Sequence, residues 1–215
     1  MIKWLIILIF FIIVIIMHTN KIHIIWKTFL KRGFRANRGD FGVYCYDGKQ
    51  GNFKTFSVVS FLLENKDKRI YSNIKSLKGV KYKPIDSFED LLKLRSEHDC
   101  IIVYDEIFTA LTRTSKINTD VLDFLSQMRK RRIIFITTCQ EWLEINITLR
   151  RYCRYRINCT TLNLPFITLI IKRFYDAEQM KWSNDENEYV APLIETTVSK
   201  PNLYIAKSYD TYEQI

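Results

Sequence analysis

Residues 48–55 read GKQGNFKT, directly after the apolar run FGVYCY, and this junction decides the fold. A phosphate-binding loop follows the pattern GxxxxGK[ST] between a strand and a helix. Gly48, Lys54 and Thr55 match that pattern, whereas Phe53 stands where a glycine is expected. The loop is therefore a near match, and by itself it leaves an ordinary strand–turn–helix connection as the alternative.

The chemistry of such a loop assigns a role to each of its residues. Glycines let backbone N–H groups curl around phosphates at a helix N-terminus, a lysine neutralises the β- and γ-phosphates, and a hydroxyl binds magnesium. Gly51 supplies a second flexible position, and the helix-like stretch TFSVVSFLLE follows. We expect these residues to bind ATP: Gly48, Gly51, Asn52, Phe53, Lys54 and Thr55, with Thr55 as a magnesium ligand.

A second element is the run DCIIVYDE at residues 99–106, an apolar strand that ends in two acids. Asp105 suits the carboxylate that holds the magnesium-bound water. Glu106 is then placed to act as the general base on the attacking water. The alternative is an acidic pair that merely ends a strand, but its spacing from the loop fits the same fold class.

The third element is IIFITTCQ at residues 133–140, another buried strand with a polar end. A polar residue at this place can sense the γ-phosphate, and Gln140 is the candidate. A plain surface glutamine is the alternative.

Two basic clusters flank this third strand. The cluster before it predicts contacts with DNA phosphates and comprises Arg129, Lys130, Arg131 and Arg132. In the cluster after it, Arg150 or Arg151 is expected to act on a neighbouring subunit. There its positive charge would stabilise the transition state of ATP hydrolysis. The alternative for each of these residues is a solvated basic face.

The remaining pattern alternates short apolar strands with amphipathic stretches, which indicates a mainly parallel sheet covered on both faces. Strands are expected at Phe41–Tyr46, Arg69–Ser72, Cys100–Tyr104 and Ile133–Thr138, and helices at Thr55–Glu64, Phe88–Arg95 and Asp120–Lys130. An antiparallel pair is expected at Tyr152–Cys159 and Phe166–Tyr175, an irregular segment at 176–200 and an edge strand at Asn202–Lys207.

Composition narrows the functional classes. The 215 residues carry a formal net charge of +10, which points to nucleic acid, nucleotide or a membrane surface as partner. The five cysteines form no CxxC pair, so reduced thiols fit better than a disulfide framework or a zinc site. With three histidines, histidine-based catalysis is disfavoured.

The N-terminal run Trp4–Met17 has no charged residue and predicts a membrane anchor. As a helix it spans roughly 21 Å, and residues 1–19 with a snorkelling Lys3 approach a ~30 Å hydrocarbon core. A signal peptide and a buried core helix are the alternatives. Basic residues are concentrated after the run, in a linker at 20–40, so we expect a single-pass protein with the ATPase domain at 41–215 on the cytoplasmic side.

Taken together, the stretches GKQGNFKT, IIVYDE, RKRRIIFITTCQ and LRRYCRYRINC resemble the FtsK–HerA superfamily of P-loop ATPases. They are most similar to its viral branch, which comprises the zonula occludens toxin-like (Zot-like) assembly proteins of filamentous phages and the packaging ATPases of small membrane-containing viruses. The resemblance covers roughly residues 40–175. It implies an α/β RecA-like core with sheet order 5-1-4-3-2, a homo-oligomeric ring and ATP-driven movement of viral DNA.

We therefore expect a membrane-tethered, Mg²⁺-dependent ATPase that packages or extrudes viral DNA, in the host inner membrane or a virion membrane. Phage coat or capsid proteins are further expected partners. The alternative is a non-hydrolysing membrane scaffold for virion assembly, because the side chain of Phe53 could crowd the approach of the β-phosphate.

Overall fold

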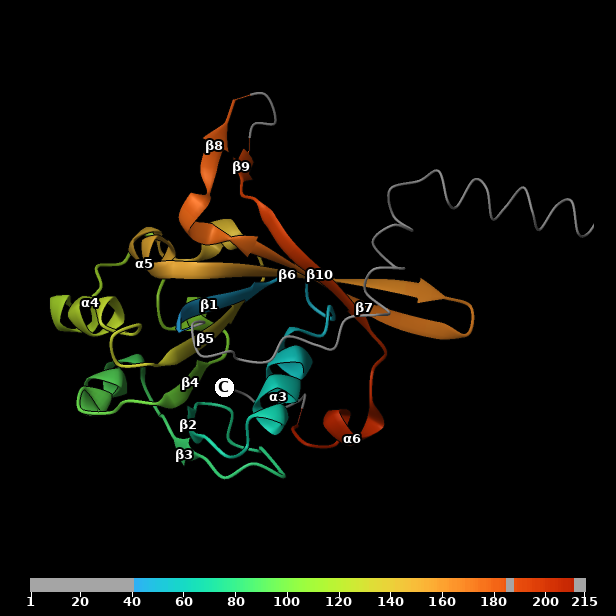
Figure 1. The fold of residues 1–215 in the computed structure, drawn as a ribbon, viewed down its shortest axis with the longest axis horizontal. Coiled ribbons are helices and arrows are strands. Elements are labelled where there is room, and N and C mark those ends of the chain that lie inside the picture. Colours follow the sequence, from blue (N-terminus) through green and yellow to red (C-terminus); the bar gives the residue numbers. More distant parts are fainter. Residues whose placement is uncertain (1–40, 185–187, 211–215) are drawn as a thin grey trace, which may run out of the picture.

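The computed structural model describes residues 41–184 and 188–210, so the expected anchor (1–19) and linker (20–40) lie outside the described residues. Within those ranges, no helix is both long and apolar enough to cross a bilayer. The described chain folds around one eight-stranded sheet (Figure 1) and a separate two-stranded sheet.

The order of the large sheet is β10-β7-β6-β1-β5-β4-β2-β3. In chain order its strands are β1 (Gly42–Asp47), β2 (Arg69–Ser72), β3 (Lys83–Pro84), β4 (Cys100–Tyr104), β5 (Ile134–Cys139), β6 (Cys153–Leu164), β7 (Ile167–Asp176) and β10 (Leu193–Ser199). From β6 to β3 every pairing is parallel, whereas β7 and β10 are antiparallel to their neighbours. Counted without the short β3, the parallel strands stand in the order 5-1-4-3-2, as the resemblance implied.

The central strands are mainly apolar because both faces of the sheet are covered, and their polar residues, Asp47 in β1 and Thr137 and Thr138 in β5, lie near the carboxyl ends. In β1, Val43 and Cys45 belong to one core cluster, which includes residues of α4 (Thr119–Ser126) and α5 (Ile147–Tyr152). Tyr44 and Tyr46 belong to the other cluster, together with residues of α3 (Lys54–Glu64). This alternation of side chains follows from the two-residue period of a strand.

Two expected helices are shorter in the structure. Where Phe88–Arg95 was expected to be an α-helix, the 3₁₀ segment η1 (Phe88–Leu94) forms instead. Ser87 precedes it, and its N–H donates to the Asp90 carboxylate at 2.9 Å. α4 ends at Ser126 rather than at Lys130, and the chain continues through turns into β5.

The C-terminal third departs most from expectation. The segment 176–200 is not irregular, because β10 extends the large sheet while β8 (Lys181–Ser183) pairs with β9 (Glu188–Val190). The edge strand expected at Asn202–Lys207 is wrong: the helix α6 (Leu203–Ala206) forms there. The Asn202 side chain caps this helix by accepting a hydrogen bond from the Tyr204 N–H at 2.8 Å.

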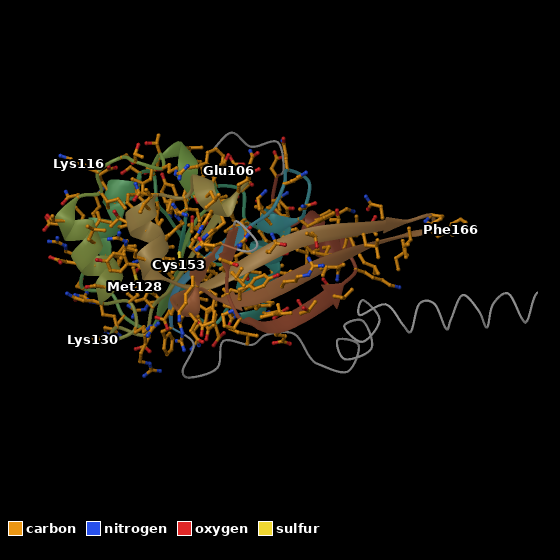
Figure 2. All side chains as sticks on the ribbon, turned by 90° about the horizontal axis from the view of Figure 1, so that it is seen from above. Glu106, Lys116, Met128, Lys130, Cys153 and Phe166 are labelled. Atoms are coloured by element: carbon orange, nitrogen blue, oxygen red, sulfur yellow. The ribbon has the colours of Figure 1, made fainter. Side chains whose placement is uncertain are left out.

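β6 and β7 form a long hairpin. Leu164 pairs with Ile167, so the stretch TTLNLP that was expected to separate the two strands lies mostly within β6. Figure 2 shows Phe166 at the far end of this hairpin, where it is 100% exposed.

Candidate nucleotide-binding site

The loop between β1 and α3 is held down by its neighbouring strands. The Gly48 N–H donates to the Gln140 carbonyl at 3.1 Å, and the Asn52 side chain donates to the Cys159 carbonyl at 3.1 Å. Thr161 in turn donates to the Asn52 side-chain oxygen. Gly48 has a φ of +150°, and a Cβ there would lie 2.3 Å from the Cys159 oxygen, so this position accepts only glycine.

Phe53 adopts the left-handed conformation, with φ 57° and ψ 33°. Glycine normally supplies this conformation, and for another residue it costs about 1–2 kcal/mol. The Phe53 carbonyl accepts hydrogen bonds from the Ser57 N–H at 2.9 Å and from the Ser57 hydroxyl at 2.7 Å. Its ring packs edge-on against Phe56, with ring centroids 5.6 Å apart. The backbone thus makes the tight turn of a phosphate loop without the glycine.

Lys54 and Thr55 open α3. The Lys54 ammonium donates to the carbonyls of Gly48 (2.6 Å) and Lys49 (3.2 Å), so the side chain arches over the loop. The first N–H groups of α3 have no partner within the helix, and they give this end a partial positive charge. Both features attract an anion to the loop.

Asp105 lies directly after β4 and is 1% exposed. Its Oδ2 accepts from the Thr55 hydroxyl at 2.9 Å, and its Oδ1 accepts from the Thr138 hydroxyl at 2.5 Å. Asn73 fixes the Asp105 backbone by donating to its carbonyl (3.0 Å) and accepting from its N–H (2.7 Å). Burial raises the pKa of the Asp105 carboxyl, and the two hydroxyl donors and the Lys54 charge oppose that rise.

Glu106 is in the left-handed region, with φ 53°. Its N–H donates to the Thr138 hydroxyl oxygen at 2.8 Å, so one threonine positions both acids. Burial raises the pKa of Glu106, and the negative charge of Asp105 raises it further. A carboxylate with a raised pKa accepts a proton more readily at neutral pH.

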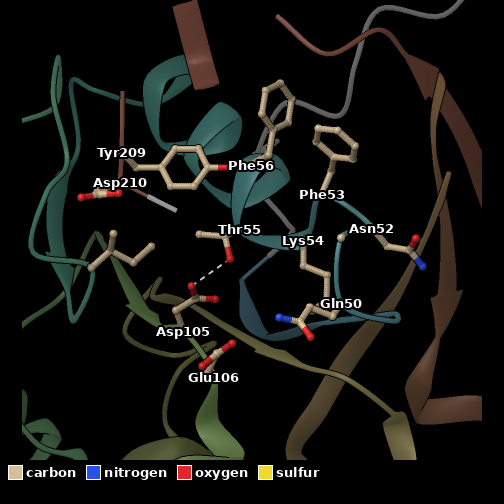
Figure 3. Close-up of a pocket in the computed structure, with 12 residues that line it drawn as sticks. Gln50, Asn52, Phe53, Lys54, Thr55, Phe56, Asp105, Glu106, Tyr209 and Asp210 are labelled. Atoms are coloured by element: carbon tan, nitrogen blue, oxygen red, sulfur yellow. Dashed lines mark hydrogen bonds between the residues drawn. The ribbon is translucent and has the colours of Figure 1, made fainter. Parts of the chain in front are cut away.

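These residues meet in one cavity of about 440 Å³ (Figure 3). Its lining comprises Gln50, Gly51, Asn52, Phe53, Lys54, Thr55, Phe56, Ile74, Asp105, Glu106, Tyr209 and Asp210. The predicted loop residues and both predicted acids are therefore brought together. Gly48 does not line the cavity but anchors the loop through its hydrogen bond to the Gln140 carbonyl.

Sequence reasoning missed four contributors to this site. Asn73 and Thr138 carried a usable signal, because each is a polar residue at the end of an apolar strand. Tyr209 and Asp210 carried none, since they lie far from the loop in the chain. Burial raises the pKa of Tyr209 to about 12, with a smaller contribution from the charge of Asp105.

Gln140 lies on the other side of the loop from the two acids. Gln140 is exposed and lines a second cavity of about 370 Å³, which Arg156 and Trp142 also line, and its backbone carbonyl accepts from the Gly48 N–H. Within the described ranges, the lining of the Asp105 cavity does not include Gln140.

The second cavity contains an ion pair that the sequence did not suggest. Asp47 is the last residue of β1 and is 2% exposed. The Arg156 guanidinium donates to both of its oxygens, at 3.0 and 2.8 Å, and Asn158 donates at 3.1 Å. Arg156 also lies over the rings of Trp142 and Tyr175.

The predicted basic residues lie away from the loop. Arg150 and Arg151 sit on α5 and line a third cavity of about 360 Å³. Since α5 leads into the start of β6, beside Val43, these arginines lie toward the amino ends of the parallel strands. Figure 2 shows Lys130 on the side of the molecule opposite Glu106.

Three of the four residues 129–132 already have partners. Arg129 pairs with Glu178, Arg131 donates to Gln127, and Arg132 pairs with Asp99 at 2.8 Å. Among the described residues, no such partner is found for the Lys130 ammonium.

The donor set beside the loop fits magnesium. The Thr55 hydroxyl and the Asp105 carboxylate are hard oxygen donors, and Mg²⁺ is usually held by one or two such side chains together with waters and phosphate oxygens. Over the described part of the chain, no cluster of three His, Cys, Asp or Glu residues forms a separate metal site.

No protein-family model matches the chain, and no curated protein matches it. Among solved structures, it is similar to the N-terminal domain of zonular occludens toxin from Neisseria meningitidis, with a TM-score of 0.54 and 16% identity over 79% of this chain and 98% of that one. It is also similar to B204, described as the DNA-packaging ATPase from Sulfolobus Turreted Icosahedral Virus, with a TM-score of 0.50 and 10% identity over 75% and 98% of the two chains. At these identities the likeness shows the fold, a RecA-like P-loop core.

Proposed function

We propose that this chain is a magnesium-dependent ATPase, tethered to a membrane, that moves DNA during viral genome packaging or phage assembly. The observation that carries the nucleotide part is the hydrogen bond of 2.9 Å between the Thr55 hydroxyl and Asp105. It places the two expected magnesium ligands, from α3 and from the end of β4, side by side in the cavity that Lys54 also lines.

Lys54 and the loop backbone would bind the triphosphate. The ammonium that now donates to the Gly48 and Lys49 carbonyls can turn to the β- and γ-phosphate oxygens. The N–H groups at the start of α3 add further donors. Because this cradle is preformed, little reorganisation is needed when charge develops on the phosphoryl group.

Glu106 would take the proton from the attacking water. Glu106 lines the same cavity, and burial together with the charge of Asp105 raises its pKa, which makes its carboxylate a stronger base. Thr138 fixes the backbone of Glu106 relative to Asp105, so the base and the metal ligand keep their spacing. Thr55 and Asp105 would hold the magnesium ion, which when bound neutralises charge on the β- and γ-phosphates.

The DNA cargo, the membrane anchor and the action within a ring have support of their own. The DNA cargo is supported by the fold shared with a protein described as a DNA-packaging ATPase and by the +10 charge. The membrane anchor is supported by the apolar run Trp4–Met17 and its basic flank. The position of Arg150 and Arg151, away from their own loop, is compatible with action on a neighbouring subunit of a homo-oligomeric ring.

Two substitutions in the full chain test the enzymatic assignment. We expect Lys54→Ala to weaken Mg-ATP binding and abolish turnover, because the phosphate charge loses its counter-ion. We expect Glu106→Gln to bind Mg-ATP normally and lower turnover by at least about 100-fold, since only the base is lost. Steady-state phosphate release, with and without DNA, and an equilibrium titration with labelled ATP measure the two effects separately.

Lys66→Ala and Glu141→Gln are matched controls, because both residues are exposed, lie outside the loop and do not line the Asp105 cavity. Unchanged hydrolysis in both Lys54→Ala and Glu106→Gln would refute the assignment.

Saturable ATP binding without turnover in the unmodified chain would favour the non-hydrolysing scaffold. Figure 3 shows the Phe53 ring pointing away from Asp105, while Phe53 is one of the residues that line the cavity.

A further inference from the structure

The cavity beside the loop has two chemically different ends. Figure 3 shows Lys54 and Gln50 on one side, Tyr209 and Asp210 on the other, and Thr55 and Asp105 between them. The phosphate loop forms the first end, and a C-terminal segment forms the second. A volume of about 440 Å³ lies within the range of small-molecule sites that enclose a whole ligand.

The segment that carries Tyr209 is fixed to the body of the protein. The Ser208 carbonyl accepts from the Lys78 N–H at 2.8 Å, and the Asp210 N–H donates to the Ser76 hydroxyl at 2.9 Å. Ser208 itself is 4% exposed, and its hydroxyl donates to the Tyr204 carbonyl at 2.8 Å. Tyr209 packs against the same core cluster as α3. The second end of the cavity is therefore formed by a segment that is fixed to the rest of the protein.

The charges of the lining give a bound nucleotide one orientation. Among the described residues that line the cavity, Lys54 is the single cation, and it belongs to the loop end. The acids of the lining, Asp105, Glu106 and Asp210, lie toward the middle and the other end, so phosphate is attracted to the loop end. Phosphates therefore go to the loop, and the uncharged nucleoside goes toward Tyr209.

Tyr209 and Ile74 offer that nucleoside an aromatic and an aliphatic surface. A purine or pyrimidine base gains free energy from stacking on an aromatic ring, whichever base it is. A tyrosine whose ring borders the cavity is suited to this contact.

We propose that the C-terminal segment forms the nucleoside subsite of this pocket, with the ring of Tyr209 as the surface on which the base stacks. This proposal rests on the proposed nucleotide-binding function of the same cavity and adds the part of the site that binds the nucleoside. It assigns part of the site to residues about 155 positions away from the phosphate loop in the chain.

The test compares two probes on the full chain: Mg-ATP, and inorganic tripolyphosphate with Mg²⁺, which has the phosphates but no nucleoside. We expect Tyr209→Ala to weaken ATP binding by about 5- to 150-fold, the range for loss of one base–aromatic stack. Tripolyphosphate binding should stay within about twofold of the unmodified chain. Tyr209→Phe keeps the ring and should bind ATP normally.

Tyr204→Ala is the matched control, because Tyr204 lies on the same segment, is 64% exposed and does not line the cavity. Unchanged ATP binding in Tyr209→Ala would overturn the proposal. Equal weakening of ATP and tripolyphosphate would overturn it too, since Tyr209 would then act on the loop. If the unmodified chain binds neither probe, the proposed function itself has failed, and the subsite falls with it.

Discussion

At the scale of single residues, Phe53 shows that a conformation can persist where its usual residue is absent. The position needs a positive φ, and phenylalanine supplies it with the help of two hydrogen bonds from Ser57 and an aromatic contact with Phe56. The strain is local, because the loop is over-determined by its contacts with β5 and β6.

Two substitutions at this position separate the strain from the packing. Both Phe53→Gly and Phe53→Ala lose the ring contact with Phe56, but only glycine relieves the left-handed backbone. We expect Phe53→Gly to be more stable than Phe53→Ala by about 1 kcal/mol in the free energy of unfolding, measured by urea titration. Equal stabilities would mean that the positive φ carries no strain.

The site also shows which residues a sequence can identify. Thr55, Asp105 and Glu106 could be predicted because each follows a strand whose end faces the same edge of a parallel sheet. The role of Gln140 as a phosphate sensor stays a prediction, because β5 ends at Cys139 and Gln140 lines the second cavity rather than the Asp105 cavity. Thr138, two residues earlier and still in β5, makes the contacts with both acids.

At the scale of elements, β1 and β6 are joined by the ion pair between Asp47, which is buried, and Arg156, whose side chain is 23% exposed. Asp47 ends the strand that leads into the phosphate loop, so the pair fixes the base of the loop against the hairpin. Removing one partner leaves the other charge buried and unpaired, which is far more costly than losing an exposed pair.

We expect Arg156→Met to lower the free energy of unfolding by about 3–5 kcal/mol, because Asp47 loses its guanidinium partner. The combined variant Asp47→Asn, Arg156→Met should recover a large part of that loss. The control is Arg132→Met, whose pair with Asp99 has side-chain exposures of 58% and 41% and should contribute less than about 1 kcal/mol. Similar losses in Arg156→Met and Arg132→Met, measured by denaturant titration, would contradict the structural role of the pair.

The elements also show where prediction from sequence ends. The parallel strands β1, β4 and β5 were found because their apolar runs are nearly continuous and buried on both faces, whereas the exposed two-residue strand β3 was missed. The antiparallel pair β6 and β7 was predicted, whereas β8 and β10 were missed because they are partly exposed and their sequences mix charged and apolar residues. The pairing of β10 is set by its partner in the sheet, β7, which no local pattern records.

At the scale of the whole molecule, the nucleotide cavity and the basic cluster at 129–132 lie at opposite edges of the parallel strands. Three members of that cluster are engaged with Glu178, Gln127 and Asp99. If this edge contacts DNA, Lys130 is the member whose charge is most available to phosphate.

We therefore expect Lys130→Ala to weaken DNA binding by more than any one of the three arginine substitutions and to make the salt slope of log K shallower by about one unit. ATP binding should be unchanged, because Lys130 is remote from the cavity. Lys116→Ala is the control on the opposite side (Figure 2). Titrations at several salt concentrations measure the slope, and an identical slope for Lys130→Ala and the unmodified chain would rule out this edge as the DNA contact.

Gly48 packs against the Cys159 carbonyl, and this contact changes which residue of the loop best identifies a phosphate-binding loop in a sequence. A sequence pattern that requires a glycine before the lysine does not match this chain, although the structure forms the loop. The steric demand falls instead on the first glycine, where β6 leaves no room for a Cβ, while Gly51 faces open space. Divergent relatives of this chain are better sought by a glycine after the first strand, a Lys-Thr pair that opens the helix and a neighbouring strand whose carbonyl lies against that glycine.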